Sequence, residues 1–512
     1  MLVKTFGCAV HGVKAIMITV EVNIVAGVDY HLVGLPDSAV KESNLRIESA
    51  VKHVGLVMPR MKIVVNMAPA DIRKEGSSYD LTIAAGILAA SEQIPFEDLS
   101  KYLIMGELSL DGTLKPIKGA LPIAIEAKKK GFKGFILPKI NAREAAIVSG
   151  LEVYGMQNIS EVVSFLKGES VVEPIVINPK EDFFNNQDFF DIDFEDVKGQ
   201  ENIKRAMEIA AAGGHNIILI GPPGAGKTML AKRFPTILPP LTLNESLETT
   251  KIHSVAGKLK SNDSLITTRP FRAPHHTVSD TALVGGGAFP QPGEISLAHN
   301  GVLFLDELPE FKRSVLEVMR QPLEERRVTI SRTKSSVEFP ASFMLVASMN
   351  PCPCGYFNHP DKECTCLPGV VHRYLSKVSG PLLDRIDIHL EVTPVSFNEL
   401  TNQRKSEPSS TIRERVMKAR MIQAERYNDN DEIYCNAQIG AKHVKEICQI
   451  SDAGNAILRT AMERLGLSAR AYDRILKVSR TIADLEGSEE IKIEHLAEAI
   501  QYRSLDRDTW EK

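Results

Sequence analysis

The chain has 512 residues, of which 43% are hydrophobic and 25% are charged, and its formal net charge is -4 at pH 7. This composition is typical of a globular protein, and the length predicts about three domains. The small net charge excludes binding to nucleic acid through a general basic surface, so any such contact must come from a local patch. Because no long apolar run and no signal peptide is evident, we expect a cytoplasmic protein that does not enter a membrane.

The first segment, residues 1–168, predicts an α/β domain. Apolar and polar residues alternate at 16–24, which is typical of a strand with one buried face. A second strand is expected at 61–67, and a hairpin with a two-residue Asp-Gly turn is expected at 103–117. Predicted helices and short strands then alternate to the end of the segment, as they do in α/β domains.

Residues 169–193 are rich in Pro, Asn, Asp and Phe without a clear period, and we interpret them as a linker. An apolar run at 216–220 then precedes the pattern G-x-x-x-x-G-K-[ST], and a helix start follows it. In this context backbone amides cradle the phosphates of a nucleotide. The sequence therefore predicts ATP or GTP binding through eight residues, Gly221, Pro222, Pro223, Gly224, Ala225, Gly226, Lys227 and Thr228.

A second apolar strand, 302–305, ends in two acidic residues, Asp306 and Glu307. We expect Lys227 to neutralise the β- and γ-phosphates, and Thr228 and Asp306 to hold Mg²⁺. Glu307 is the predicted base that orients or deprotonates the attacking water. The two acids could instead only begin a loop, but the apolar run before them is typical of a buried parallel strand and disfavours that alternative.

A third strand, 343–348, is followed by Asn350, whose amide can position a water, although Asn before Pro is also an ordinary turn. The sequence Leu-Leu-Asp-Arg-Ile-Asp follows at 382–387. This order of motifs resembles an AAA+ ATPase. The resemblance implies that Asn350 is sensor 1 and that Arg385 is an arginine finger that completes a neighbour's site. It also implies that Arg470 is sensor 2, acting in cis on the γ-phosphate, although either arginine could be a surface salt-bridge partner.

The stretch 269–280, the glycine run 285–287 and the Asn-Pro-Cys-Pro-Cys-Gly segment at 350–355 resemble the YifB/ComM family of magnesium-chelatase-like AAA+ ATPases, and the resemblance covers essentially the whole chain. It implies ATP and Mg²⁺ as ligands, a homo-oligomeric ring, usually of six, and a motor that acts on DNA like a branch-migration helicase. An alternative is an ATPase that remodels a protein complex, as chelatase subunits do. A nucleotide-dependent scaffold without activity is disfavoured by the complete set of catalytic residues.

The resemblance also implies a domain division. The expected fold is a multidomain α/β protein with a Lon-protease-like (S5 domain 2-like) domain, a P-loop core and an all-α lid. The expected parts are the Lon-like domain at 1–168, the linker at 169–193, the ATPase core at 194–400 with insertions at 250–300 and 351–368, and the helical lid at 401–512.

The Lon-like segment keeps a serine, Ser78, where Lon proteases carry their nucleophile. The position of the partner lysine holds Leu121, which cannot accept the proton of a serine. We therefore predict no peptidase activity, and we expect this domain to serve as a scaffold for ring assembly or for DNA.

Four of the seven cysteines lie in one short window, Cys352, Cys354, Cys364 and Cys366. Four thiolates are the ligand set of a structural zinc site, which leaves no coordination position for water. Both pairs have C-x-C spacing, whereas C-x₂-C is commoner in zinc sites. Two disulfides or an ordinary loop therefore remain alternatives.

Residues 328–340 predict two strands joined by a basic, serine-rich tip. The resemblance implies a hairpin that points into the pore of the ring, where Arg332 and Lys334 contact DNA phosphates without reading sequence. A solvated hairpin tip is the alternative. Arg269 and Arg272 are the second pair of candidate DNA contacts. The two adjacent histidines of the same stretch are interpreted as packing or hydrogen-bonding residues.

Overall fold

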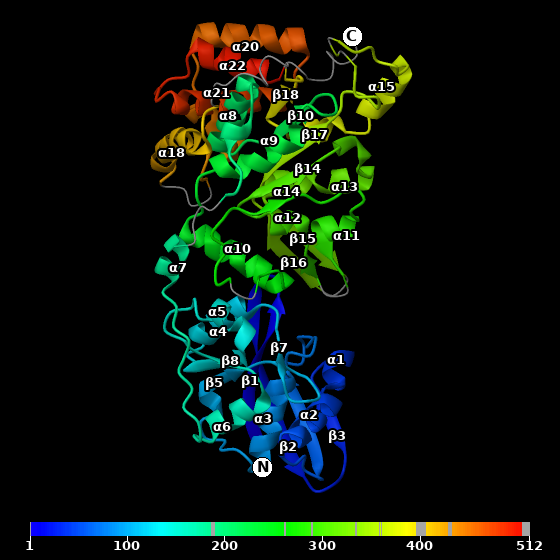
Figure 1. Cartoon of the computed structure of the whole chain (residues 1–512), viewed down its shortest axis with the longest axis vertical. Helices are drawn as coiled ribbons and strands as arrows, with labels where there is room; N and C mark the ends of the chain where they lie inside the picture. Colours follow the sequence, from blue (N-terminus) through cyan, green and yellow to red (C-terminus); the bar gives the residue numbers. More distant parts are fainter. Residues whose placement is uncertain are drawn as a thin grey trace.

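The computed structural model describes residues 2–185, 190–260, 263–287, 290–332, 335–357, 359, 361–395, 406–428 and 433–503. An amino-terminal α/β unit lies at one end of the molecule, a second α/β unit lies in the middle, and a group of helices lies at the other end (Figure 1).

The amino-terminal unit contains two sheets. The strands of the first sheet are β1 (Leu2–His11), β2 (Lys14–Val25), β3 (Tyr30–Val33) and β4 (Lys62–Ala68). Their order in the sheet is β1-β2-β4-β3, and all neighbours pair antiparallel except β3 and β4, which are parallel. The second sheet is parallel, of order β5-β8-β9, and consists of β5 (Tyr102–Ile104), β8 (Gly134–Pro138) and β9 (Glu152–Met156). The predicted strands at 16–24 and 61–67 are confirmed as parts of β2 and β4.

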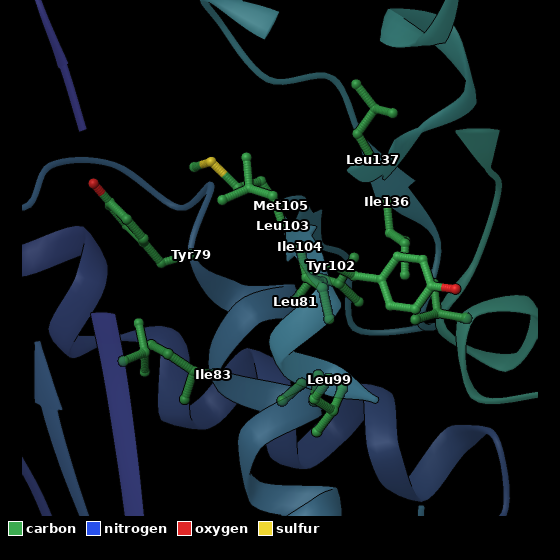
Figure 2. Packing of buried hydrophobic residues seen from close by; sticks show 14 of the residues in the cluster. Tyr79, Leu81, Ile83, Leu99, Tyr102, Leu103, Ile104, Met105, Ile136 and Leu137 are labelled. Atoms are coloured by element: carbon green, nitrogen blue, oxygen red, sulfur yellow. The ribbon is translucent and has the colours of Figure 1, made fainter. Parts of the chain in front are cut away.

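The helices of this unit are α1 (Ser38–Lys41), α2 (Ser43–His53), α3 (Asp80–Ala90), α4 (Ala120–Lys129), α5 (Lys139–Ala145) and α6 (Ile159–Leu166). Every residue of α3 is buried, which explains why that helix is apolar all round. Its Leu81 and Ile83 lie in one cluster with Leu103 and Ile104 of β5 and with Ile136 of β8 (Figure 2). The predicted Asp-Gly hairpin is confirmed as β6 (Glu107–Leu108) paired with β7 (Leu114–Lys115).

The predicted linker contains a helix that its irregular composition did not indicate, α7 (Pro179–Asn185). Phe183 of α7 is 3% exposed and packs with Leu121 and Ile147 of the amino-terminal unit and with Leu241 and Leu265 of the central unit. The segment 169–193 therefore takes part in the contact between the two units.

The central unit is built on a five-stranded sheet in which all pairs are parallel, of order β11-β14-β17-β10-β18. Its strands are β10 (Ile217–Ile220), β11 (Phe271–Arg272), β14 (Val302–Leu305), β17 (Met344–Met349) and β18 (Ile388–Glu391). The helices of this unit are α8 (Glu201–Gly213), α9 (Lys227–Arg233), α10 (Leu243–Ala256), α11 (Asp280–Val284), α12 (Glu294–Leu297), α13 (Arg313–Val318), α14 (Arg320–Glu325), α15 (Pro368–Leu375) and α16 (Gly380–Leu383).

Two hairpins extend the central unit, β12 (Gly285–Gly286) with β13 (Gln291–Pro292), and β15 (Arg327–Arg332) with β16 (Ser335–Pro340). The second confirms the two strands predicted at 328–340, although its tip lies outside the described residues. The turn between β1 and β2 lies against this hairpin: a Cβ atom on Gly12 would come within 3.0 Å of Val337, and Val13 packs against the same apolar cluster as Phe339.

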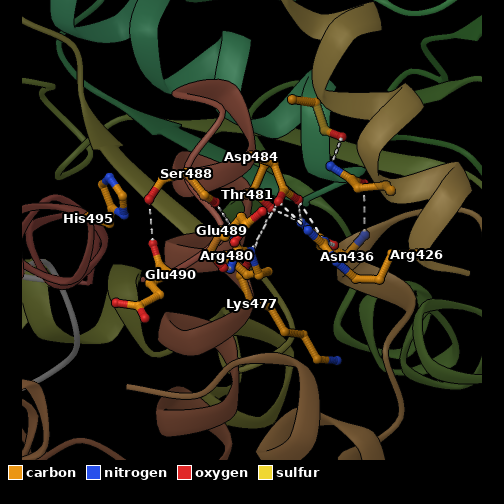
Figure 3. A network of polar contacts seen from close by, with 12 residues as sticks. Arg426, Asn436, Lys477, Arg480, Thr481, Asp484, Ser488, Glu489, Glu490 and His495 are labelled. Carbon is orange, nitrogen blue, oxygen red and sulfur yellow. Dashed lines mark hydrogen bonds and ion pairs between the residues drawn. The ribbon is translucent and has the colours of Figure 1, made fainter. Parts of the chain in front are cut away.

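The carboxy-terminal region is helical, as predicted, with α18 (Ser409–Arg426), α19 (Ala441–Ile447), α20 (Asp452–Leu465), α21 (Ala469–Leu485) and α22 (Ile493–Gln501). The buried carboxylate of Asp484 joins α21 to α18, because it accepts hydrogen bonds from Arg426, Asn436 and Arg480 (Figure 3). Among the described residues, no helix is both long enough and apolar enough to span a membrane.

Candidate functional site

The candidate site lies at the carboxyl edge of the central sheet. Three neighbouring parallel strands, β10, β14 and β17, end there, with Ile220 opposite Met349 and Leu305 opposite Ala347. Because parallel strands end at the same edge, the phosphate loop, the acidic pair and Asn350 are brought together although they are distant in sequence.

The phosphate loop turns between β10 and α9 through two glycines in the left-handed region, Gly224 (φ 79°) and Gly226 (φ 86°). Residues with a Cβ atom rarely adopt this conformation. Gly221 is required for a different reason: a Cβ atom there would lie 2.2 Å from the carbonyl oxygen of Val392, the residue that follows β18. The glycines therefore allow the backbone to make the tight loop that a phosphate needs.

Lys227 is 9% exposed, and its ammonium group is surrounded by oxygen atoms. Its Nζ atom lies 2.6 Å from the carbonyl oxygen of Gly221 and 2.9 Å from that of Pro222. The same atom lies 3.0 Å from Oδ1 of Asn350, so the structure brings the predicted sensor 1 residue to the loop lysine. Burial lowers the pKa of Lys227, and the nearby carboxylates, that of Asp306 first, oppose this shift.

Thr228 and Asp306 form a second contact across the site. The Thr228 hydroxyl donates a hydrogen bond of 2.8 Å to Oδ2 of Asp306, and the Ser348 hydroxyl donates to the other carboxylate oxygen. Mg²⁺ prefers hard oxygen ligands and is usually bound through one or two carboxylates. A hydroxyl and a carboxylate side by side at the phosphate loop fit this donor set.

Glu307 has a left-handed backbone (φ 55°), and its side chain is 57% exposed. Its Oε2 atom lies 3.6 Å from Nδ1 of His276, which belongs to the loop after β11. The imidazole of His276 lies 4.0 Å, centroid to centroid, from that of His275 and has an edge contact with Phe311. The sequence predicts packing or hydrogen-bonding roles for the histidine pair, but no motif indicates that His276 lies beside the predicted base.

Arg385 is buried, with 4% of the residue exposed, and it pairs within its own chain. One guanidinium nitrogen lies 2.6 Å from Oε1 of Glu324 at the end of α14. The Asn216 side chain, just before β10, donates to the backbone oxygen of Arg385, which ties this arginine to the central sheet. Its role as a finger for a neighbouring chain stays a prediction.

Arg470 lies exposed in the first turn of α21, and its role as sensor 2 also stays a prediction. Arg474, one turn further along α21, forms an ion pair of 2.5 Å with the buried Asp387. Burial raises the pKa of Asp387, but Arg474 and then His215 outweigh this and hold the pKa well below its usual value. Arg474 therefore links the carboxy-terminal helices to the motif that carries Arg385.

The candidate DNA contacts fall into two groups. The side chain of Arg332, and all of Lys334, lie outside the described residues. Arg269 donates to the carbonyl oxygens of Pro239 and Asn300 and pairs with Glu245. Arg272 forms two hydrogen bonds, of 2.6 and 2.7 Å, with the carboxylate of Glu294. These partners give Arg269 and Arg272 a structural role, and their contact with DNA stays a prediction.

The four cysteines of the window come together. All four sulfur atoms lie within 4.8 Å of one another, and three of the separations are 3.3, 3.5 and 3.7 Å. None of the four is in a disulfide. The structure therefore favours the metal-binding interpretation over two disulfides, because a disulfide brings its sulfurs to about 2.05 Å.

The two predicted positions of the Lon-like segment lie in different surroundings. Leu121 is fully buried in the cluster between the amino-terminal and central units, and its amide donates to Glu144. The carbonyl oxygen of Ser78 accepts a hydrogen bond from the amide of Gly106 beside β5. The absence of peptidase activity stays a prediction.

Three family models match successive segments of the chain, one in each of the amino-terminal, central and carboxy-terminal parts. Models of the family "Magnesium chelatase, subunit ChlI" match residues 193–400, the related "Subunit ChlI of Mg-chelatase" matches 20–141, and the ChlI C-terminal model matches 406–503. The competence protein ComM of Haemophilus influenzae is 45% identical over 498 residues, which cover 97% of this chain and 96% of that protein. The YifB protein of Escherichia coli is 44% identical over 499 residues, again covering 97% and 96%.

A more distant relative is Lon protease 2 of Bacillus subtilis, which is 28% identical over 193 residues, 34% of this chain and 33% of that protease. The phosphate loop, the acidic pair and the matching core and C-terminal models define a magnesium-chelatase-like AAA+ protein. Within that class, the chain belongs to the YifB/ComM family.

Proposed function

We propose that the protein is an ATP-hydrolysing ring motor that acts on DNA. The observation that carries the nucleotide part is the pair of contacts Lys227–Asn350 and Thr228–Asp306, which join three separate motifs at one edge of the sheet. The similarity to a protein named competence protein ComM supports the DNA part.

Each residue of the site has a role in this proposal. Lys227 neutralises phosphate charge, and Thr228 and Asp306 hold Mg²⁺, which supplies positive charge at the phosphoryl group. Glu307 takes a proton from the attacking water, or orients it, and Asn350 positions the same water. Arg470 contacts the γ-phosphate in cis, from the helices that act as a lid.

The ring follows from the proposed role of Arg385. A guanidinium that stabilises the transition state from a neighbouring chain contributes about 10³–10⁵ in rate, so efficient turnover needs an assembled oligomer. We propose a hexamer. Because Arg385 is paired with Glu324 of its own chain, it has to exchange that carboxylate for the neighbour's phosphate during assembly or turnover.

We place the DNA contact on the β15–β16 hairpin, through Arg332 and Lys334. The test is ATP turnover with and without branched and single-stranded DNA. The double variant Arg332→Ala/Lys334→Ala keeps its basal turnover but loses stimulation by DNA. The matched control is Arg327→Ala at the base of the hairpin, where the arginine pairs with Glu325 and Glu338, and this variant retains stimulation.

The second candidate is an ATPase that remodels a protein complex, which the chelatase models favour. Turnover that is indifferent to every DNA form would support this candidate and contradict the motor. Loss of all turnover in Lys227→Ala is expected in both cases, so that variant tests only the nucleotide site.

We also propose a structural zinc ion on Cys352, Cys354, Cys364 and Cys366. The four sulfurs are close enough to share one metal ion. With four thiolates, tetrahedral coordination is complete, so the ion has no catalytic duty.

A further inference from the structure

The cysteine cluster has the dimensions of a closed tetrahedral site. Zinc–sulfur bonds of about 2.3 Å at tetrahedral angles separate the sulfurs by about 3.8 Å. The separations among Cys352, Cys354 and Cys364 are 3.3, 3.5 and 3.7 Å, and the sulfur of Cys366 lies within 4.8 Å of the other three. The amide of Gly355 donates a hydrogen bond of 3.2 Å to the sulfur of Cys352. Such a bond stabilises a thiolate, because it places a positive dipole beside the ligand.

The cluster lies directly against the nucleotide site. Cys352 is fully buried and comes two residues after Asn350, at the end of β17. Gly355 (φ 85°) faces the phosphate loop so closely that a Cβ atom on it would come within 2.4 Å of Cδ of Pro223. The cysteine segment is defined here as residues 352–357 and 361–366. It contacts the phosphate loop at Pro223, and only Pro351 separates it from Asn350 along the chain.

Both ends of this contact, Asn350 and the phosphate loop beside Pro223, lie next to Lys227. Asn350 and the carbonyl of Pro222, the neighbour of Pro223, are both within 3.0 Å of Nζ of Lys227. In its described part this segment has no helix or strand, so no regular ladder of backbone hydrogen bonds fixes its path. Cross-linking of its two ends by a metal ion supplies the missing constraint.

We infer that the cysteine segment, folded around one Zn²⁺, braces Pro223 and Asn350, so that metal loading sets the affinity of the phosphate loop for nucleotide. The inference rests on the proposed nucleotide binding and goes beyond it. Zinc binding forms four Zn–S bonds and releases up to four thiol protons to solvent, with no change of oxidation state.

The first experiment measures metal directly. The purified full-length protein is expected to hold one zinc ion per chain, and Co²⁺ substituted for it should give the absorption bands of a tetrahedral thiolate site. The double variant Cys364→Ser/Cys366→Ser is expected to lose both signals. The control Cys448→Ala removes a buried cysteine outside the cluster and should keep them. A wild-type protein that holds no metal, or holds iron instead, would overturn the zinc assignment.

The second experiment measures nucleotide affinity with a fluorescent ATP analogue and Mg²⁺. Cys364→Ser/Cys366→Ser should bind the analogue at least tenfold more weakly than wild type, with an unchanged circular dichroism spectrum. Gly355→Ala keeps all four cysteines, and we expect it to retain its zinc and still lose affinity, because its new methyl group meets Pro223.

The outcomes distinguish failure of this inference, in which the zinc-loaded cysteine segment braces the phosphate loop, from failure of the proposed nucleotide binding. If both variants bind the analogue as tightly as wild type, the brace is wrong and nucleotide binding stands. If the zinc-loaded wild type does not bind the analogue at all, the proposed function itself is wrong.

Discussion

Within its own chain, the Arg385 guanidinium pairs with the carboxylate of Glu324 and donates to the carbonyl oxygen of Pro381, and the carboxylate is accessible. The Arg385 side chain is 5% exposed, whereas that of Glu324 is 46% exposed, so water and other anions can reach the pair from one side only. Because the guanidinium is buried, leaving it without an anion would cost about 3–5 kcal/mol. The proposed exchange therefore requires that the phosphate arrives as Glu324 leaves.

The first prediction follows from this exchange. In Glu324→Gln the guanidinium keeps a neutral acceptor but loses its ionic partner, and at low protein concentration ATP turnover per chain should rise about two- to fivefold, the equivalent of about 0.5–1 kcal/mol of lost charge assistance. The control is Glu325→Gln, which changes the adjacent carboxylate that pairs with Arg327. Equal turnover in wild type and Glu324→Gln would contradict a release step for Arg385.

His276 lies where it can position Glu307. At 3.6 Å the imidazole is beyond hydrogen-bond distance of the carboxylate but close enough to limit its position, and Phe311 limits the movement of the imidazole ring. We expect His276→Ala to lower kcat about tenfold, a part of the 10²–10⁴ that a positioned base contributes, with little change in KM. His275→Ala is the matched control. If kcat is unaffected in His276→Ala, the histidine has only a packing role.

At the scale of elements, α7 shows how a short helix can fasten two units together. Two adjacent aromatic residues of α7 have opposite environments: Phe183 is 3% exposed, and Phe184 is 68% exposed. Loss of a buried phenylalanine costs about 3–5 kcal/mol, whereas surface changes usually stay within about 0.5 kcal/mol.

The third prediction uses this pair. Phe183→Ala should lower the free energy of unfolding by about 3 kcal/mol and accelerate proteolysis within 169–193. Phe184→Ala should leave both unchanged. Similar proteolysis of the two variants would mean that α7 does not hold the units together.

Strand β18 meets the end of α22 through a buried histidine. The amide of His389 donates to the carbonyl oxygen of Tyr502, and Nη1 of Arg503 lies 3.3 Å from Nε2 of His389. Burial, and then the charge of Arg503, lower the pKa of His389 to about 3, although hydrogen bonds with the backbone of Leu383 and Ile386, and then the charge of Asp387 just before the strand, oppose the shift. The folded protein therefore keeps this imidazole neutral.

The fourth prediction is the resulting pH dependence. The folded-state pKa is below the unfolded value of about 6.5, so between these values the unfolded chain binds a proton that the folded chain does not. The contribution of the neutral His389 side chain to the free energy of unfolding is complete above pH 6.5 and is lost as the pH falls toward 3. From pH 7 to pH 5, urea unfolding should show a loss of up to about 2 kcal/mol that His389→Gln reduces. An identical loss in the variant would contradict this origin.

At the scale of the whole molecule, the proposed site is shared between chains, and this can be tested by mixing two inactive proteins. Lys227→Ala lacks a working phosphate loop but keeps Arg385, and Arg385→Ala has the opposite defect. Mixed rings contain some sites with an intact loop from one chain and an intact arginine from the next. Turnover in the mixture should therefore exceed the sum of the two variants, and strictly additive turnover would contradict a site completed in trans.

Much of this architecture could be predicted from sequence, because the strand–loop–helix motif and the apolar strands fix local structure. Lys227, Thr228 and Asp306 meet because neighbouring parallel strands end at the same edge of a sheet, and this rule of topology can be applied to the sequence alone. The contacts of His276 and Glu324 could not be predicted, since both depend on the paths of segments that no motif specifies. Helix α7 was missed for a related reason: its stability comes from burial of Phe183 between two units.

The turn at Gly12 has a mechanical consequence. Strand β1 has 10 residues, about 33 Å, and with β2 it runs from the core of the amino-terminal unit to a turn at the side of the β15–β16 hairpin. If the hairpin moves during turnover, as in the motor proposed above, it has to displace the β1–β2 turn or break its packing at Val13. Under that proposal, the amino-terminal unit limits how far the hairpin can travel.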